Sequence, residues 1–168
     1  MADGHFMMAG GNVFRMRGPR EIRSQCGAIC WRREADEVQV LLVTSRDTGR
    51  WVIPKGGQID GLDDPGSAAQ EAWEEAGVRG TVLETPLGHY TYRKGLRSGS
   101  DVDCDVAVFA LKVQEIRDRF PEEGQRDRRW FTPAAAALRV CEPDLSALLA
   151  SFSPPADTNP DSLPLRPY

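Results

Sequence analysis

Residues 56–78 read GGQIDGLDDPGSAAQEAWEEAGV, and the spacing of the acidic residues in this stretch guides the interpretation of the whole chain. Glu71, Glu74 and Glu75 stand at positions i, i+3 and i+4, which share one face of a helix. Three carboxylates this close repel one another unless a divalent cation lies among them. Mg²⁺ takes oxygen ligands and keeps room for waters and substrate phosphate oxygens. The three glutamates are therefore a candidate magnesium site, with a solvated acidic helix face as the alternative.

The residues before this helix favour the metal interpretation. Residues 55–67 are rich in glycine, and such a loop can offer backbone carbonyl oxygens to a metal and amides to phosphate. Asp64 is the expected N-cap of the helix, and Pro65 suits its first position. Gly77 is the expected stop signal. The sequence therefore predicts a turning loop followed by a short helix that carries the carboxylates.

In this register the stretch resembles the Nudix box, whose pattern is GX5EX7REUXEEXGU, with U a bulky apolar residue. The resemblance implies the Nudix fold, an α/β/α sandwich with a central mixed β-sheet. It also implies a Nudix-type pyrophosphohydrolase, an enzyme that cleaves a diphosphate linkage. The matching positions are Gly56, Glu71, Glu74, Glu75, Gly77 and Val78.

Three positions depart from the box. Leu62 stands where the family has its first Glu, Gln70 where it has Arg, and Ala72 where it has a bulky apolar residue. In the family that Glu and Arg support the loop and helix through polar contacts. Both are absent together here, so neither leaves a charged partner unpaired. Asp63 and Asp64 are candidates to take over part of the Glu role, and the metal-binding glutamates are intact.

The flanks of the box are similar to one branch of the family. Residues 41–57, 72–82 and 126–140 resemble the enzymes that cleave diphosphoinositol polyphosphates and diadenosine polyphosphates. The RRWF element at 128–131, followed by an alanine-rich helix, is moderately specific for that branch. The resemblance covers roughly residues 25–152, most of the chain.

Strands outnumber helices outside the box and do not alternate strictly with them, which indicates an α+β fold rather than a doubly wound sheet. The expected strands are 25–33, 37–45, 50–54, 81–94, 101–113 and 128–133, and further helices are expected from about Pro133 and over about 143–152.

Composition fits one domain with extended ends. We expect a flexible arm at 1–22, the Nudix hydrolase domain at 23–152 and a Pro-rich flexible tail at 153–168. The formal charge of -4 argues against a general nucleic-acid binder. Four cysteines without Cys-x-x-Cys pairs and two histidines argue against structural zinc. No apolar run approaches the roughly 20 residues of a membrane span, so a cytoplasmic location is expected.

The resemblance assigns roles to the residues of the box. Glu71 and Glu75 would bind the metal through their carboxylates, and the backbone carbonyl of Lys55 would supply another oxygen. Glu74 would bind metal or act as the general base toward the attacking water. The expected cation is Mg²⁺, with Mn²⁺ as a substitute. A bound cation neutralises charge on the diphosphate oxygens and lowers the pKa of a bound water.

Four arginines are candidate substrate-binding residues, because a guanidinium group can bind phosphate oxygens in bidentate fashion. Arg46 follows a strand, in a position that resembles a substrate-binding loop of the polyphosphate branch. Arg126 resembles a phosphate contact just before the RRWF element, and Arg50 and Arg93 flank the expected loops. The alternative for each of them is an ordinary surface arginine.

The leading functional hypothesis is magnesium-dependent hydrolysis of a diphosphate bond in a nucleoside or inositol polyphosphate, of diadenosine polyphosphate or diphosphoinositol polyphosphate type. One alternative is an RNA 5′-pyrophosphohydrolase or a nucleoside triphosphate pyrophosphatase, although the acidic charge counts mildly against long RNA. An alternative of another class is a non-catalytic Nudix-fold nucleotide-binding module. The expected partner is a small-molecule polyphosphate, with neither a membrane nor a nucleic acid. The fold permits a monomer or a homodimer.

Overall fold

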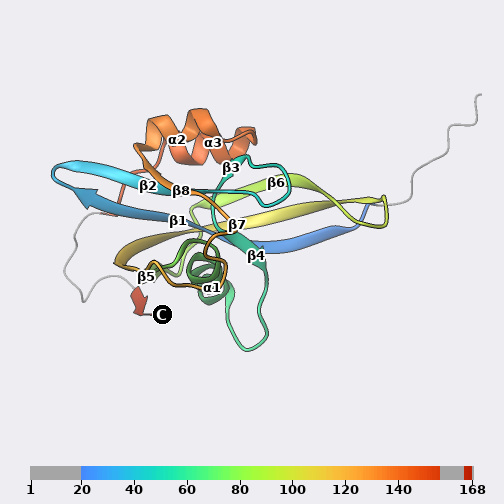
Figure 1. Ribbon diagram of the computed structural model, residues 1–168, viewed down its shortest axis with the longest axis horizontal. Helices are drawn as coiled ribbons and strands as arrows, with labels where there is room; N and C mark the ends of the chain where they lie inside the picture. The colour runs from blue at the N-terminus through green and yellow to red at the C-terminus, as the bar shows by residue number, and fades with distance from the viewer. Residues whose placement is uncertain (1–19, 156–164, 168) are drawn as a thin grey trace, which may run out of the picture.

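A mixed β-sheet lies at the centre of the molecule, with helices on both of its faces (Figure 1). The computed structural model describes residues 20–155 and 165–167 of the chain. Helix α1 (Asp64–Ala76) covers one face, and helices α2 (Pro133–Arg139) and α3 (Pro143–Ala150) cover the other. This arrangement confirms the α/β/α sandwich, and the two short helices lie where they were expected.

Nine strands among the described residues form the sheet, in the order β3-β2-β1-β7-β5-β9. In addition β4 pairs with β1, β6 with β7 and β8 with β2. Only β1 and β7 run parallel, so the sheet is mixed. The strands are β1 (Ile22–Glu34), β2 (Glu37–Thr44), β3 (Trp51–Val52), β4 (Lys55–Gly57), β5 (Val78–Leu83), β6 (Gly88–Gly95), β7 (Asp101–Ile116), β8 (Arg128–Phe131) and β9 (Leu165–Pro167).

The central strand β1 is buried on both faces, which explains why its sequence reads as a continuous apolar run. Cys26, Ala28 and Cys30 belong to the core under α1. Ile29 and Trp31 belong to the core under α2 and α3. The sheet therefore separates two apolar cores, and each one anchors the helix layer on its side.

Helix α1 begins one residue earlier than expected. Asp63 is the N-cap, and its side chain accepts a hydrogen bond from the Gly66 amide at 2.9 Å. Pro65 tolerates this shift because the N–H groups of the first turn have no intrahelical partner. Gly77 ends the helix in the left-handed conformation, with φ of 67°. The expected stop is thereby confirmed, and Asp64 is the first helical residue rather than the cap.

Most strand ends differ by a few residues from the sequence prediction, and two differences are larger. The single strand expected over 81–94 is broken into β5 and β6, because Pro86 lies between them and cannot donate a ladder hydrogen bond. The start of the predicted loop 55–67 pairs with β1 as strand β4. Gly56 and Gly57 thus hold an extended backbone against the sheet before the loop turns.

The ends of the chain are described only in part. The predicted arm at 1–22 lies outside the described residues except for 20–22, and β1 already begins at Ile22. Within the predicted tail, residues 156–164 and 168 lie outside as well, while β9 pairs antiparallel with β5. None of the described helices is long and apolar enough to cross a membrane.

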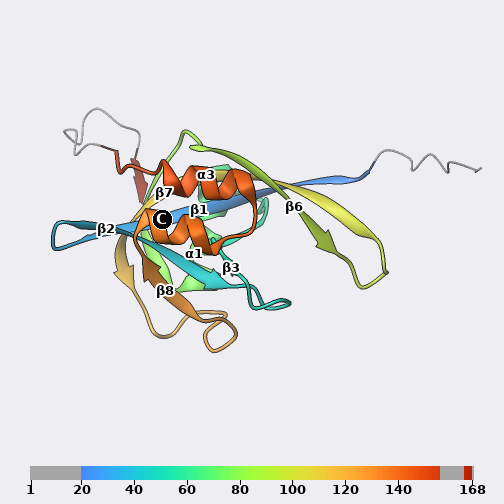
Figure 2. The same cartoon turned by 90° about the horizontal axis from the view of Figure 1, so that it is seen from above.

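The β6–β7 hairpin extends beyond the helices at one end of the molecule, as Figure 2 shows. Arg93 and Lys94 lie near its tip on β6, opposite Asp103 and Val102 of β7. The hairpin therefore carries basic side chains out to the border of the site described next.

Candidate active site

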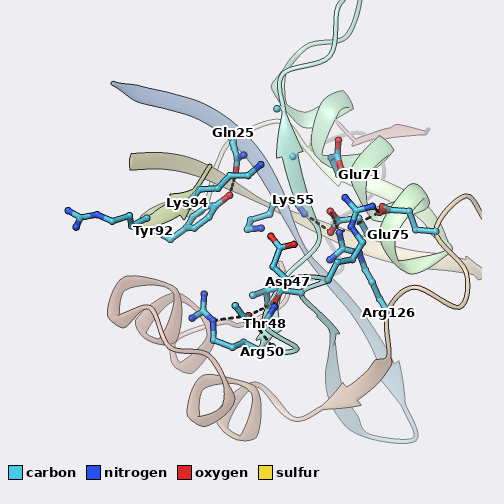
Figure 3. A pocket seen from close by; sticks show the side chains of 18 of the residues that line it. Gln25, Asp47, Thr48, Arg50, Lys55, Glu71, Glu75, Tyr92, Lys94 and Arg126 are labelled. Atoms are coloured by element: carbon cyan, nitrogen blue, oxygen red, sulfur yellow. Dashed lines mark hydrogen bonds and ion pairs between the residues drawn. The ribbon is translucent and has the colours of Figure 1, made fainter. Parts of the chain in front are cut away.

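A cavity of about 790 Å³ lies where α1, strand β4, the β2–β3 loop and the β6–β7 hairpin meet (Figure 3). The three box glutamates and all four candidate arginines line it, so the structure brings every predicted site residue to one place. The lining cations are Arg46, Arg50, Lys55, Arg93, Lys94, Arg97 and Arg126, and the lining carboxylates are Asp47, Glu71, Glu74, Glu75, Glu122 and Glu142.

Glu71 lies directly against the backbone of Gly56. A Cβ atom at Gly56 would meet the Glu71 carboxyl carbon at 2.3 Å, so only glycine allows this approach. Burial, followed by the nearby carboxylates of Glu75 and Glu74, raises the pKa of Glu71 to about 7. The carboxyl is thus crowded by like charge and would gain from a cation beside it.

Glu75 is the most tightly held of the three glutamates. Its Oε2 accepts a hydrogen bond from the Lys55 amide at 3.2 Å, and its Oε1 lies 3.1 Å from Arg126 Nη2. Burial raises the pKa of Glu75, while Arg126 and Lys55 act in the opposite direction. Strand β4 and the RRWF region therefore both fix this carboxylate.

Glu74 is oriented by one of the residues that depart from the box. Gln70 Nε2 donates to Glu74 Oε1 at 3.1 Å, from one turn earlier on α1. Ala72 is fully buried in the core under α1, and Leu62 is 39% exposed in the loop before α1. Gln70 thus orients the Glu74 carboxylate through a neutral hydrogen bond.

The loop before α1 is tied to the helix by other groups. Asp64 Oδ1 accepts a hydrogen bond from Gln58 Nε2 at 2.9 Å, and Ser67 Oγ accepts one from the Ile59 amide at 3.0 Å. Together with the Asp63 cap, these contacts fasten the loop at both ends. Asp63 and Asp64 therefore take part in supporting the loop, as the sequence suggested.

The donor set of α1 fits a hard divalent cation. Carboxylate and carbonyl oxygens are the ligands that Mg²⁺ prefers, and like-charge crowding at Glu71 is the condition that a cation relieves. Across the described residues, no three acidic, histidine or cysteine side chains converge closely enough to enclose an ion. Glu74 accepts a hydrogen bond from Gln70, and Glu75 pairs with Arg126.

Arg126 reaches the site from the inside of the protein. Its side chain is 8% exposed and lies within ion-pair distance of both Glu75 and Glu122. Its Nη1 donates to the Thr44 carbonyl oxygen at 3.1 Å. Arg126 therefore buttresses the Glu75 carboxylate, a contact that the sequence did not predict.

The other three arginines lie at the border of the cavity. Arg46 pairs with Glu122 at 3.2 Å, and Arg93 with Asp103 at 3.5 Å. Each keeps about half of its side chain exposed, which leaves donors free to face a ligand. Arg50 pairs with Glu142 at 3.3 Å and is more enclosed.

Lys55 contributes its side chain as well as its backbone. Figure 3 shows this side chain between Tyr92 on one side and Glu71 and Glu75 on the other. Its Nζ lies 4.7 Å from the centre of the Tyr92 ring, and burial lowers its pKa. The Tyr92 hydroxyl is fixed in turn by Gln25 Oε1 at 2.7 Å. The positively charged ammonium group of Lys55 is thus held in the middle of the cavity.

The comparisons with known proteins agree with this geometry. The family profile of the NUDIX domain matches residues 23–152. The chain belongs to the Nudix family. Members of this family hydrolyse phosphoanhydride bonds, generally with divalent cations such as Mg²⁺, and the predicted class of Nudix-type pyrophosphohydrolase is confirmed. The matched range also coincides with the predicted domain.

Relatives of this Nudix chain include plant and animal proteins. Nudix hydrolase 12, mitochondrial, of Arabidopsis thaliana is 38% identical over 109 residues, which are 63% of this chain and 53% of that protein. The chain therefore spans about half the length of this relative. Diphosphoinositol polyphosphate phosphohydrolase 3-beta of Bos taurus is 30% identical over 122 residues, covering 71% of this chain and 70% of that protein.

A solved structure supports the Nudix fold. The crystal structure of the C. elegans Ap4A hydrolase superposes with a TM-score of 0.55 at 20% identity, covering 77% of this chain and 94% of that one. At this identity the likeness concerns the fold alone. The predicted cytoplasmic location stays a prediction, since the name of the plant relative places that protein in mitochondria.

Sequence reasoning missed several polar residues of the cavity. Glu122 stands four residues before Arg126 and pairs with it, and Glu142 stands directly before the proline that opens α3. Tyr92 occupies the expected strand but was not singled out. Glu122 lies in the loop between β7 and β8, Glu142 directly before α3 and Tyr92 within β6, so no shared sequence signal marks them.

Proposed function

We propose that this Nudix enzyme hydrolyses, with Mg²⁺ as cofactor, a diphosphate bond in a nucleoside or inositol polyphosphate. The observation that carries the proposal is the register of Glu71, Glu74 and Glu75 beside Gly56, within one cavity bordered by arginines. The names of the relatives point to the two substrate types, since one is a diphosphoinositol polyphosphate phosphohydrolase and another an Ap4A hydrolase.

The positions of the residues support the following roles. Glu71, Glu75 and the Lys55 carbonyl hold the cation, which on binding neutralises charge on the diphosphate and lowers the pKa of a water. Glu74 lies on the same helix face and either shares in binding or removes the proton from the attacking water. Gln70 keeps its carboxylate oriented in either role.

The basic side chains divide into two groups. Arg46, Arg50 and Arg93 face the cavity from its border and bind phosphate oxygens of the substrate. Lys55 Nζ lies deeper and contacts the phosphates nearest the carboxylates. Arg126 acts through Glu75, which its guanidinium group keeps in place.

A phosphate-release assay tests the proposal directly. The panel contains diadenosine tetraphosphate, a diphosphoinositol polyphosphate, 5′-triphosphorylated RNA and the nucleoside triphosphates, each with Mg²⁺, with Mn²⁺ and with EDTA. We expect metal-dependent turnover of one of the first two substrates. Turnover confined to RNA ends or nucleoside triphosphates would assign the alternative enzyme class. Tight binding of a nucleotide without any turnover would show a binding module instead.

A further inference from the structure

Glu142 is a buried carboxylate of the cavity that the proposed chemistry does not use. It precedes α3 at the N-cap position, yet its side chain makes no capping hydrogen bond. Its side chain is 9% exposed, and its Oε1 accepts a hydrogen bond from Arg50 Nη1 at 3.3 Å. Its other oxygen, Oε2, is buried, and no donor reaches it from any residue that the structure describes.

An unpartnered carboxylate oxygen in such a place needs a physical reason. Leaving a buried acceptor unsatisfied costs free energy, and buried polar groups in native proteins nearly always find a partner. A Glu is also a poor choice for an N-cap, where Ser, Thr, Asp or Asn is preferred. Neither folding nor capping accounts for Glu142, whereas a ligand that donates a hydrogen bond inside the cavity would.

The position of Glu142 separates it from the reacting end of the cavity. Its partner Arg50 also donates to Thr48 Oγ1 at 3.3 Å, and Figure 3 shows these two residues together. Glu71 and Glu75 lie in Figure 3 on the side of α1, beyond Lys55. The Arg50 end therefore faces the part of a substrate that lies away from the bond to be cleaved.

We propose that Glu142 Oε2 accepts a hydrogen bond from the non-phosphate part of the substrate and so selects a nucleoside polyphosphate. The proposal rests on the proposed function and narrows it to one of the two substrate types. Arg50 holds Oε1, whereas Oε2 of this cavity-lining residue has no partner among the described residues. Glu142 is thus a specificity-determining residue rather than part of the metal site.

The chemistry of the two substrate types decides between them. Ribose hydroxyls and the adenine amino group are neutral donors that can face a carboxylate. An inositol ring that carries phosphate or diphosphate at every position has no hydroxyl left to donate. Its phosphates would instead meet the negative charge of Glu142 and repel it.

The test compares two substrates in one variant. Glu142→Gln keeps the size of the side chain but removes its charge, and Glu123→Gln removes the same charge at an exposed position outside the cavity lining. We expect Glu142→Gln to lower kcat/KM for diadenosine tetraphosphate by about 10- to 100-fold, the effect of losing a hydrogen bond to a charged acceptor. Activity on a diphosphoinositol polyphosphate should stay unchanged or rise, and Glu123→Gln should alter neither.

Several outcomes would overturn the proposal. Equal losses of kcat/KM on both substrates, with a lowered melting temperature, would show that Glu142 has only a structural role. No loss of kcat/KM on either substrate would show that Glu142 has no role in substrate selection. Tyr90 has a buried hydroxyl that also lacks a partner among residues 20–155 and 165–167. Tyr90→Phe could change the ratio of the kcat/KM values for the two substrates as much as Glu142→Gln does. In that case Tyr90, and not the ligand, would donate the hydrogen bond to Glu142 Oε2.

A binding measurement separates this proposal from the proposed function. If the wild-type protein turned over neither substrate, the proposed function would fail, but calorimetry would still give the ratio of the two Kd values. A wild-type preference for diadenosine tetraphosphate that Glu142→Gln removes would support the role of Glu142. An unchanged ratio would contradict it.

Discussion

Gly56 shows how a single missing side chain shapes the site. The carboxylate of Glu71 occupies the space where any other residue would place its Cβ atom. At Gly57, one residue later, an added Cβ atom would have no heavy atom within 4 Å. The first glycine of the box is therefore fixed by contact with the Glu71 carboxylate, whereas the second is not.

Replacing Gly56 should consequently damage activity more than stability. We expect Gly56→Ala to reduce kcat by about 100-fold, the scale of a 1 Å misplacement of a catalytic group. Gly57→Ala is the matched control and should retain most of the activity. Steady-state kinetics with saturating Mg²⁺ and thermal melts would compare the two variants. Similar kcat values for both would show that the position of Glu71 is unimportant.

Arg126 is a second residue whose role only the structure shows. It forms buried contacts with Glu75 and Glu122 from a position 51 residues away from Glu75 in the chain. Removing Arg126 alone leaves Glu75 without its charged partner, and breaking a buried pair in this way is costly.

We expect Arg126→Met to lower the free energy of unfolding by about 3 kcal/mol. The double variant Arg126→Met with Glu75→Gln should recover much of this loss, because the unpaired charge is then gone. Urea denaturation of the two single variants and the double variant measures the coupling. Strictly additive effects would mean that Arg126 does not buttress Glu75.

Helix α1 carries the three box glutamates, and its two ends were predictable to within one residue. Proline and glycine mark helix ends through local backbone rules, which a sequence displays directly. The hairpin of β1 and β2 was equally clear, with Cys30 opposite Leu41. What the sequence could not show were the pairing of β4 with β1 and contacts such as Arg50 with Glu142, 92 residues apart. Such contacts depend on tertiary folding and leave no local signal.

Gly77, at the end of α1, and Gly124 both have a left-handed backbone conformation. Replacement by alanine should destabilise the protein more at Gly77 than at Gly124. A Cβ at Gly77 would meet Phe120 at 2.4 Å, whereas at Gly124, which has a similar φ, nothing lies within 4 Å. Gly124→Ala should therefore cost only the strain of a left-handed residue, about 1–2 kcal/mol. Gly77→Ala should cost about 1–3 kcal/mol more through overpacking. Chemical denaturation measures both, and equal losses would contradict the close contact with Phe120.

At the scale of the whole molecule, the sheet separates two cores, and the cavity that holds the candidate site lies at its border. The α/β/α architecture was predicted from the resemblance of residues 56–78 to the Nudix box, and the apolar strands were predicted from the sequence pattern. The choice of substrate could not be predicted from the sequence, because the cavity is formed by segments that lie far apart in the chain. Glu142 and the β6–β7 hairpin enter the cavity only once the chain has folded.

The central claim is that the carboxylates of α1 hold the cation and activate the water. Its most direct test is kcat with saturating Mg²⁺ for Glu74→Gln and for Glu75→Gln, with circular dichroism to verify the fold. On the best substrate of the panel, we predict that each variant loses about 10²- to 10⁴-fold in kcat while remaining folded. Near wild-type kcat in both variants would contradict the assignment of the active site.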